Sequence, residues 1–322
     1  MTLTVCVPVW NGEAFVAETL EGLRVQSLRD IQVLISIEKG DDGSLDICRA
    51  FAGADPRFEV FAQSTRFGWI GNANWLLRRV TTEFASVMPH DDVIPPNYLE
   101  RLTDTLSKRP KAVLAHGDMR TFGRERVSYA GAVLTGDRFD RTLTHLCEFT
   151  NAAAWHGVFR AKMFEKVLLE EVNGPAADQV WQLHAAIQGD FAHDPGAVYR
   201  MRLHPLSVVA QARTVTGIPT DSHWVDHCVS CHQVATATGQ WTSAQKQAIT
   251  AACLMRASEA PTESMASLVL TAADFAERLS GQVAPGSGSM VRAKLPEKVL
   301  RHLQDRFSSV VANHGRRRWF SS

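Results

Sequence analysis

The sequence has few cysteines, no surplus of either charge and no long apolar run. Its 322 residues include 6 scattered cysteines, which is typical of a reduced cytoplasmic protein rather than a disulfide-bonded secreted one. Lysine plus arginine and aspartate plus glutamate each number 34, so no basic excess favours nucleic acid or membrane as a general partner. No apolar stretch approaches the roughly 18 residues of a membrane-spanning helix, and the first residues lack the basic region of a signal peptide.

The chain does contain enough apolar sequence for a large core. Hydrophobic residues make up 45% and charged residues 21%, which is ordinary for a globular protein, and the length allows more than one structural unit. Apolar runs of strand length alternate with amphipathic stretches of helix length. This alternation predicts βαβ units and a mainly parallel sheet. The predicted strands cover 3–10, 31–37, 58–64, 83–89 and 111–119.

The second half of the chain changes character. Residues 154–168 predict a strand that runs into a helix, 177–189 a helix and 196–204 a strand, and from about residue 211 the pattern is helical throughout. The Gly/Ser/Pro-rich stretch "GQVAPGSGSM" is typical of a linker. We therefore expect four regions: an α/β domain over 1–210, a helical region over 211–280, a flexible linker over 281–294, and a C-terminal helix with a basic tail over 295–322.

Polar residues gather where the predicted strands end. Asp91 and Asp92 follow the fourth strand directly, and two neighbouring carboxylates can bind a hard divalent cation; a solvated turn or a helix cap is the alternative. Trp10 and Glu38 follow the first and second strands. Open α/β sheets bind ligands at the carboxyl ends of their strands. An aromatic face and a carboxylate there could hold a nucleobase, although a half-buried tryptophan and a surface glutamate would look the same.

Three stretches carry a resemblance to a known family. "VCVPVWNGEAFVAETLEGLRVQSLRDIQVLIS", "GDDGSLDICRAFAGADPRF" and "VMPHDDVIPPNYLERL" together resemble the nucleotide-sugar domain of family 2 glycosyltransferases, which have the GT-A fold. The likeness is close over residues 1–120 and looser to about 210. It implies a Rossmann-like α/β nucleotide-binding domain with a mainly parallel mixed sheet, followed by a helical C-terminal region.

The resemblance also implies where the nucleotide binds. Pro8 and Trp10 match the end of the family's first strand, where the aromatic stacks on the base. Glu38 matches the second of the two acids that usually follow the second strand and would contact the base. Asp91 matches the family's Asp motif and would contact the ribose or the metal.

The same resemblance assigns the metal and the catalytic base. Asp92 would coordinate Mn²⁺ or Mg²⁺ that bridges the donor's diphosphate, and His204 in "YRMRLH" would reach the metal or the diphosphate. Asp178 matches the family's general base, which would take the proton from an acceptor hydroxyl and lead to inversion at the anomeric carbon. From the residues alone, Asp178 reads instead as an acid in the first turn of a helix.

Four positions depart from the family pattern. Ile37 stands where the first of two acids is usual, Pro89 and His90 precede Asp91 in place of the leading acid, and Ala177 replaces the glutamate before the base. The Gln-x-x-Arg-Trp motif of processive synthases is absent, which indicates a non-processive enzyme. The departures leave open a different base preference, or a non-catalytic nucleotide-sugar or carbohydrate-binding module.

The predicted activity implies its partners and setting. We expect an inverting, metal-dependent transferase that takes a UDP- or dTDP-sugar and glycosylates a saccharide or glycoconjugate in bacterial polysaccharide synthesis. A nucleotidyltransferase is disfavoured because "PVWNGEAF" has no lysine or arginine to bind a triphosphate. We expect a cytoplasmic protein with no nucleic-acid partner and no transmembrane segment. The basic tail at 316–318 would allow peripheral contact at the inner face of the membrane.

A second cluster of metal-ligand residue types lies in "HWVDHCVSCH". His223, His227 and Cys231 are spaced four apart on one predicted helix face, and zinc accepts such ligands. Structural zinc sites usually draw ligands from two elements, whereas this cluster occupies one. The neighbouring apolar residues favour a packed helix.

Overall fold

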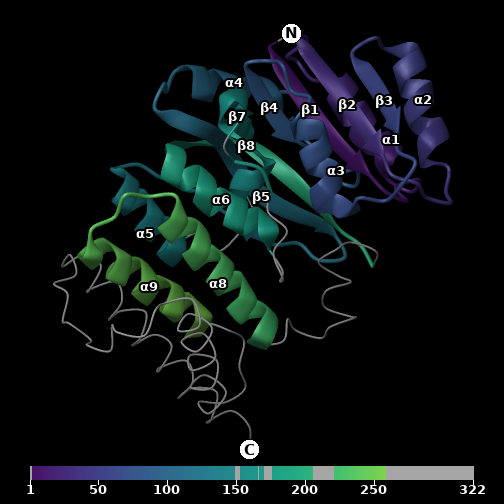
Figure 1. Ribbon diagram of the computed structural model, residues 1–322. Helices are drawn as coiled ribbons and strands as arrows, with labels where there is room; N and C mark the ends of the chain where they lie inside the picture. The colour runs from purple at the N-terminus through teal and green to yellow at the C-terminus, as the bar shows by residue number, and fades with distance from the viewer. Residues whose placement is uncertain (1, 149–152, 166, 170–175, 206–220, 259–322) are drawn as a thin grey trace, which may run out of the picture.

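The computed structural model describes residues 2–148, 153–165, 167–169, 176–205 and 221–258. Figure 1 shows a central sheet with helices on both faces and a group of helices beside it. The strands are β1 (Leu3–Val9), β2 (Ile31–Ile37), β3 (Phe58–Ala62), β4 (Phe84–Val87), β5 (Ala112–Gly123), β6 (Ser128–Tyr129), β7 (Val158–Arg160) and β8 (Asp190–Leu203). The helices are α1 (Val16–Arg24), α2 (Ser44–Ala54), α3 (Gly68–Leu77), α4 (Tyr98–Ser107), α5 (Arg138–Glu148), α6 (Ala177–Gln188), α8 (Asp221–Ala237) and α9 (Ser243–Ser258), with 3₁₀ turns η1 (Ala153–His156) and η2 (Ala161–Glu165).

The sheet has the order β3-β2-β1-β4-β7-β5-β6, and β8 pairs with β5. Strands β1, β2, β3 and β4 are parallel, as are β5 and β8, while β7 is antiparallel to both β4 and β5. The mainly parallel mixed sheet predicted from the sequence is therefore confirmed. A separate bridge between Val93 and Arg200 brings the segment after β4 against the end of β8.

Alternating side chains of the central strands fill two cores. In β1, Val5 and Val7 face the core beneath α1, α2 and α4, whereas Cys6 between them faces the core beneath α3 and α6. All three side chains are fully buried, because helices cover both faces of the sheet. Such double burial explains why these strands read as continuous apolar runs rather than as an alternating pattern.

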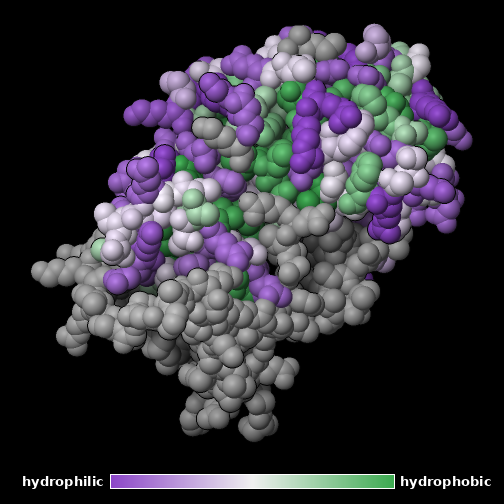
Figure 2. All heavy atoms as spheres, viewed as in Figure 1, coloured by the Kyte–Doolittle hydropathy of each residue, from purple (hydrophilic) through white to green (hydrophobic). Residues whose placement is uncertain are grey.

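A third core forms between helices from distant parts of the chain. Helices α5, α6, α8 and α9 pack on one another, and α6 also contributes Trp181 to the sheet's second core. Helix α6 thus joins the helical group to the sheet. In the space-filling view of Figure 2, most described residues on this group's surface are polar.

Two sequence predictions are corrected by the structure. Residues 154–168 form η1, the three-residue strand β7 and η2, rather than a strand and an α-helix; the apolar residues here fill gaps beside β4 and α6 and do not follow one period. Strand β8 begins at Asp190, six residues before the prediction. Its first part mixes the buried Phe191 and Ala192 with polar residues, Pro195 and Gly196, which hid the strand pattern. The boundary predicted at 210–211, the segment 281–294 and the segment 295–322 lie outside the described residues.

Candidate active site

The carboxyl ends of β1, β2 and β4 lie side by side at one edge of the sheet. Val9 pairs with Ile37, and Cys6 pairs with Val87, so the residues that follow these strands emerge together. The bridge of Val93 to Arg200 adds the end of β8 to the same edge. Residues from four separate stretches of sequence therefore meet at this edge.

Hydrogen bonds between two neighbouring loops hold the first part of this edge. The Asn11 side chain donates to the Asp41 carboxylate over 3.0 Å, and the Gly12 amide donates to the Ser44 hydroxyl over 2.8 Å. Asn11 has a φ of 48°, a left-handed conformation that asparagine tolerates. These bonds tie the β1–α1 loop to the β2–α2 loop and fix the backbone that follows Trp10.

Trp10 and Glu38 are both contacted by the loop between β3 and α3. The guanidinium carbon of Arg66 lies 3.5 Å from the centre of the Trp10 ring. The amide of the next residue, Phe67, donates a hydrogen bond to Oε1 of Glu38. Glu38 is buried, whereas Trp10 is half-buried and Arg66 is exposed. The structure thus places the two residues expected to bind a base within reach of one short segment.

Asp92, expected as a metal ligand, is engaged within the protein through both carboxylate oxygens. The Tyr199 hydroxyl donates to Oδ2 and the Arg202 amide to Oδ1, each over 2.6 Å. Burial, followed by the negative charge of Asp91, raises the pKa of Asp92 well above its ordinary value. The Thr19 hydroxyl is 2.8 Å from the Asp92 carbonyl oxygen. These contacts are those of a residue that anchors the loop after β4 to β8.

Asp91 points its carboxylate toward His204. Oδ2 of Asp91 is 2.9 Å from Nε2 of His204, although 113 residues separate them. The His204 ring packs against Phe15, with centroids 4.3 Å apart, and its Nδ1 is buried without a hydrogen-bond partner. Both side chains are half-buried. Of the two aspartates, Asp91 is the one whose carboxylate remains available at the edge of the sheet.

The pair fits a divalent cation that binds through few protein ligands. Carboxylate and imidazole both suit Mn²⁺, and Mg²⁺ usually takes one or two carboxylates together with substrate phosphates and water. No group of three or more potential ligand side chains occurs among the described residues. Asp91 and His204 would thus hold such an ion only together with oxygens from a ligand.

Asp178 lies in the first turn of α6. The turn opens at Ala176 in a left-handed conformation, with φ 64° and no side-chain cap. Loss of hydration raises the pKa of Asp178 to about 6, opposed by bonds from the Gln179 amide and its own amide. Within the described residues, no hydrogen bond or ion pair joins Asp178 to Asp91, His204 or Trp10. The helix-terminal interpretation is compatible with a base, since a pKa near the working pH suits proton transfer.

Sequence reasoning missed two residues that shape the site, Arg202 and Tyr199. Arg202 donates through Nε to the Asp91 carbonyl over 2.8 Å, and it also pairs with Glu18 of α1. Tyr199 bonds to Asp92, and its ring stacks on His156 with centroids 4.1 Å apart. Tyr199 and Arg202 both precede His204 in "YRMRLH", where their spacing of three along a strand gives no periodic signal.

Pro8 of β1 is also contacted by His90, which follows β4. Nδ1 of His90 lies 3.4 Å from the Pro8 carbonyl oxygen, and the ring covers Gly12 so closely that an added Cβ would lie 2.5 Å from Cδ2. His90, which with Pro89 precedes Asp91 where the family has its leading acid, therefore packs against the β1–α1 loop. Pro8 lies within β1, opposite Ser36 of β2.

The other predicted features give no second site among the described residues. In α8, Cys231 and Cys228 are buried in the helical core, with Cys231 Sγ 3.6 Å from His227 Nε2; the His223 side chain lies outside the described residues. The basic tail at 316–318 lies outside them too. No helix in the described part of the chain has the length and apolarity needed to cross a membrane.

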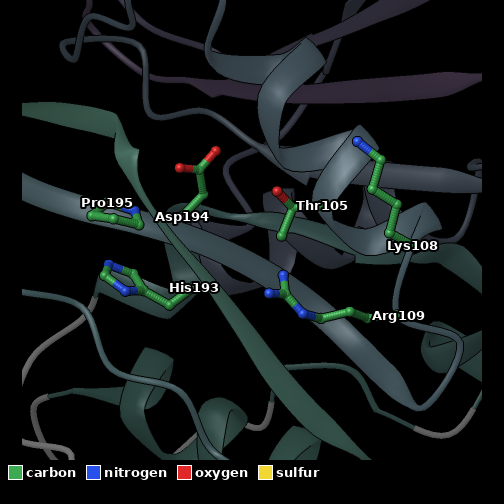
Figure 3. Close-up of a pocket in the computed structure, with 6 residues that line it drawn as sticks. All are labelled: Thr105, Lys108, Arg109, His193, Asp194 and Pro195. Atoms are coloured by element: carbon green, nitrogen blue, oxygen red, sulfur yellow. The ribbon is translucent and has the colours of Figure 1, made fainter.

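A hollow of about 530 Å³ opens elsewhere, between the end of α4 and β8. Figure 3 shows its lining residues: Thr105, Lys108, Arg109, His193, Asp194 and Pro195. Two of these already have partners, since Asp194 pairs with Arg101 over 2.7 Å and His193 with Asp118 over 2.8 Å. None of the predicted site residues lines the hollow.

Comparison with known proteins gives a consistent result. The family described as Glycosyl transferase family 2 matches residues 4–168, about half of the chain. Glycosyltransferase GlyA of Streptococcus pneumoniae is 22% identical over 177 residues, covering 51% of this chain and 25% of that protein. The chain thus spans only about a quarter of the length of this relative.

Solved structures share the fold at low identity. A 1–349 fragment of S. aureus TarS superposes with a TM-score of 0.61 at 16% identity, covering 88% of this chain and 83% of that one. The mannosyltransferase PcManGT of Pyrobaculum calidifontis, solved with GDP-Man and Mn²⁺, gives a TM-score of 0.51 at 15% identity and covers 99% and 88%. These likenesses confirm the GT-A fold.

Proposed function

This chain belongs to glycosyl transferase family 2, and from that premise we propose that it transfers a sugar from a nucleotide-diphosphate donor, a UDP- or dTDP-sugar, to a hydroxyl of a saccharide or glycoconjugate. The observation that supports this most directly is the approach of His204 to Asp91 at 2.9 Å. It brings together the ends of β4 and β8, where a diphosphate would lie beside the carboxyl edge of the sheet.

The nucleotide end of the donor would lie along β1 and β2. Trp10 offers a half-buried ring on which a base can stack. Oε1 of Glu38 accepts a bond from Phe67, and its second oxygen remains available to accept an N–H from the base. The β1–α1 loop, held by Asn11 and Ser44, keeps the Trp10 backbone in place.

We assign the metal-facing role to Asp91 and His204, with Asp92 as the residue that positions them. Mn²⁺ or Mg²⁺ bound there with the diphosphate would stabilise the negative charge that develops on the leaving nucleotide. Asp92 fixes the Arg202 amide, and Arg202 in turn holds the Asp91 carbonyl. Both contacts leave the Asp91 carboxylate directed toward His204.

Asp178 is the group we propose to take the proton from the acceptor hydroxyl. With its pKa raised to about 6, it is ionised at neutral pH and yet basic enough to accept a proton in the transition state. A hydroxyl that attacks the anomeric carbon from the face opposite the leaving diphosphate inverts its configuration. The outcome would be a β-linked product from an α-linked donor, in one non-processive transfer.

The second candidate is a nucleotide-sugar or carbohydrate-binding module without turnover. Two observations favour it: Ile37 and Ala177, which stand where the family has acids, are both buried apolar residues, so neither position offers a replacement group. With either function, we place the protein in bacterial polysaccharide synthesis, in the cytoplasm or at the inner face of the membrane.

The deciding experiment measures turnover and binding on the same protein. The purified chain is incubated with UDP- and dTDP-sugars, with and without Mn²⁺, and released nucleotide is quantified beside calorimetric binding. Metal-dependent release of UDP or dTDP from one sugar donor supports the transferase. Binding of a donor with no release across a broad acceptor panel supports the module, and absence of any binding contradicts both.

A further inference from the structure

Arg66 occupies one face of the Trp10 ring. Its guanidinium carbon is 3.5 Å from the ring centre, which is contact distance for planar groups. A base inserted between the two would need them about 7 Å apart, twice an ordinary carbon–carbon contact distance. A base and the Arg66 guanidinium therefore cannot stack on this face of Trp10 at the same time.

The residues after Arg66 are anchored, whereas the Arg66 side chain is not. Phe67 is anchored through its amide to the carboxylate of Glu38, and Gly68 follows with a φ of 74°, which turns the chain into α3. Arg66 itself is exposed, and in the described residues its ring contact with Trp10 is the one interaction recorded for its side chain. The guanidinium can leave Trp10 and enter water while Phe67 stays in place.

We propose that Arg66 is an internal competitor for the donor's base: its guanidinium covers one face of the Trp10 ring and must leave before the base can stack on that face. This inference rests on the proposed nucleotide-binding role of Trp10. Base–aromatic stacking is worth more than an exposed cation–π contact, so the base displaces Arg66 but loses part of its affinity in doing so.

Arg66→Ala should therefore tighten nucleotide binding. An exposed cation–π contact is worth about 0.5–1 kcal/mol, so its removal should lower the dissociation constant about two- to fivefold. A residue that contacts the base or the phosphates directly would produce the opposite sign. The gain in affinity should vanish when Trp10 is also replaced by alanine, because there is then no ring for Arg66 and the base to compete for.

The chain offers a matched control in the same part of the fold. Arg79 stacks on Trp75 with 3.2 Å between its guanidinium carbon and the ring centre, and Trp75 packs against the α3 core, away from the predicted base site. Arg79→Ala removes a contact of the same kind and should leave nucleotide affinity unchanged.

The test is calorimetric titration of UDP and dTDP, with Mn²⁺, into wild type, R66A, R79A, W10A and the R66A/W10A double variant. Tighter binding by R66A alone, or binding that appears only in R66A, supports the competition. Unchanged or weaker binding by R66A, or an equal gain in the W10A background, overturns it while leaving the transferase proposal intact. If neither wild type nor R66A binds either nucleotide, the proposed nucleotide-binding role fails and the competition fails with it.

Discussion

The two regions in which the sequence suggests a metal site are arranged in opposite ways. At the carboxyl edge of the sheet, Asp91 and His204 come together from positions 113 residues apart and leave a buried imidazole nitrogen without a partner. In α8, His227 and Cys231 lie one turn apart; Cys231 belongs to the third apolar core, and His227 is fully buried beside it. Close spacing on one helix places side chains on one face, and here that face packs. Convergence of strand ends places side chains together at the carboxyl edge of the sheet, where open α/β sheets bind their ligands.

The largest expected effect on activity concerns Asp178, in the first turn of α6, which joins the helical group to the sheet. Asp178→Asn keeps the shape of the side chain but cannot accept a proton at neutral pH, so transfer should fall by about 10²–10⁴-fold while donor affinity stays near normal. Initial rates and donor titrations on the same variant check this. Transfer that survives at the wild-type rate would move the base to another residue.

The pH dependence of wild type gives an independent reading of the same group. Because the pKa of Asp178 is raised to about 6, its basic form is lost as the pH falls through that value. Transfer should decline below about pH 6 in wild type, and the residual activity of Asp178→Asn should lack this decline. Equal acid limbs in the two proteins would contradict the assignment.

The next effect concerns the aromatic side of the sheet edge. Trp10→Ala should weaken nucleotide binding by about 1–3 kcal/mol, the usual worth of base–aromatic stacking. Trp75→Ala is the control, since it removes a tryptophan that also carries an arginine on its face. An unchanged dissociation constant for W10A, measured by calorimetry, would place Trp10 outside the base site.

The two neighbouring aspartates should separate stability from binding. Asp92→Ala leaves the buried Tyr199 hydroxyl and the Arg202 amide unpaired and should lower the free energy of unfolding by about 2 kcal/mol. Asp92→Asn should cost less, because burial and the charge of Asp91 raise the pKa of Asp92 and so favour a neutral side chain there. Asp91→Ala should change stability little and remove metal-dependent donor binding. Urea denaturation and Mn²⁺ titration compare the three variants.

How far the sequence predicts this protein depends on the range of the interactions involved. The strands β1 to β4 and the ends at Trp10, Glu38 and Asp91 follow from local periodicity and from the rule that ligands bind at carboxyl ends of strands. The different roles of Asp91 and Asp92 do not. They depend on which of two adjacent carboxylates faces Tyr199, a contact across 107 residues.

Other features of the fold and the site were equally hidden from local patterns. β7 has three residues and inserts between β4 and β5, so its own sequence could not show its place in the sheet. The position of Arg66 over Trp10 depends on how the β3–α3 loop crosses the end of β1. A contact between an exposed loop residue and a strand end has no periodic signature.

The smallest expected effect is the absence of any change in the helical group when metal is removed. If His227 and Cys231 only pack, a strong chelator should leave the helix content and the melting temperature of the protein unchanged, while it abolishes Mn²⁺-dependent donor binding at the sheet edge. The buried thiols Cys228 and Cys231 sit in an apolar core, where burial raises the pKa of Cys231 to about 11 and so disfavours the thiolate that zinc requires. Circular dichroism before and after chelation measures the effect. A large loss of helix that added zinc restores would show that α8 holds a structural metal and that close spacing had indicated a site after all.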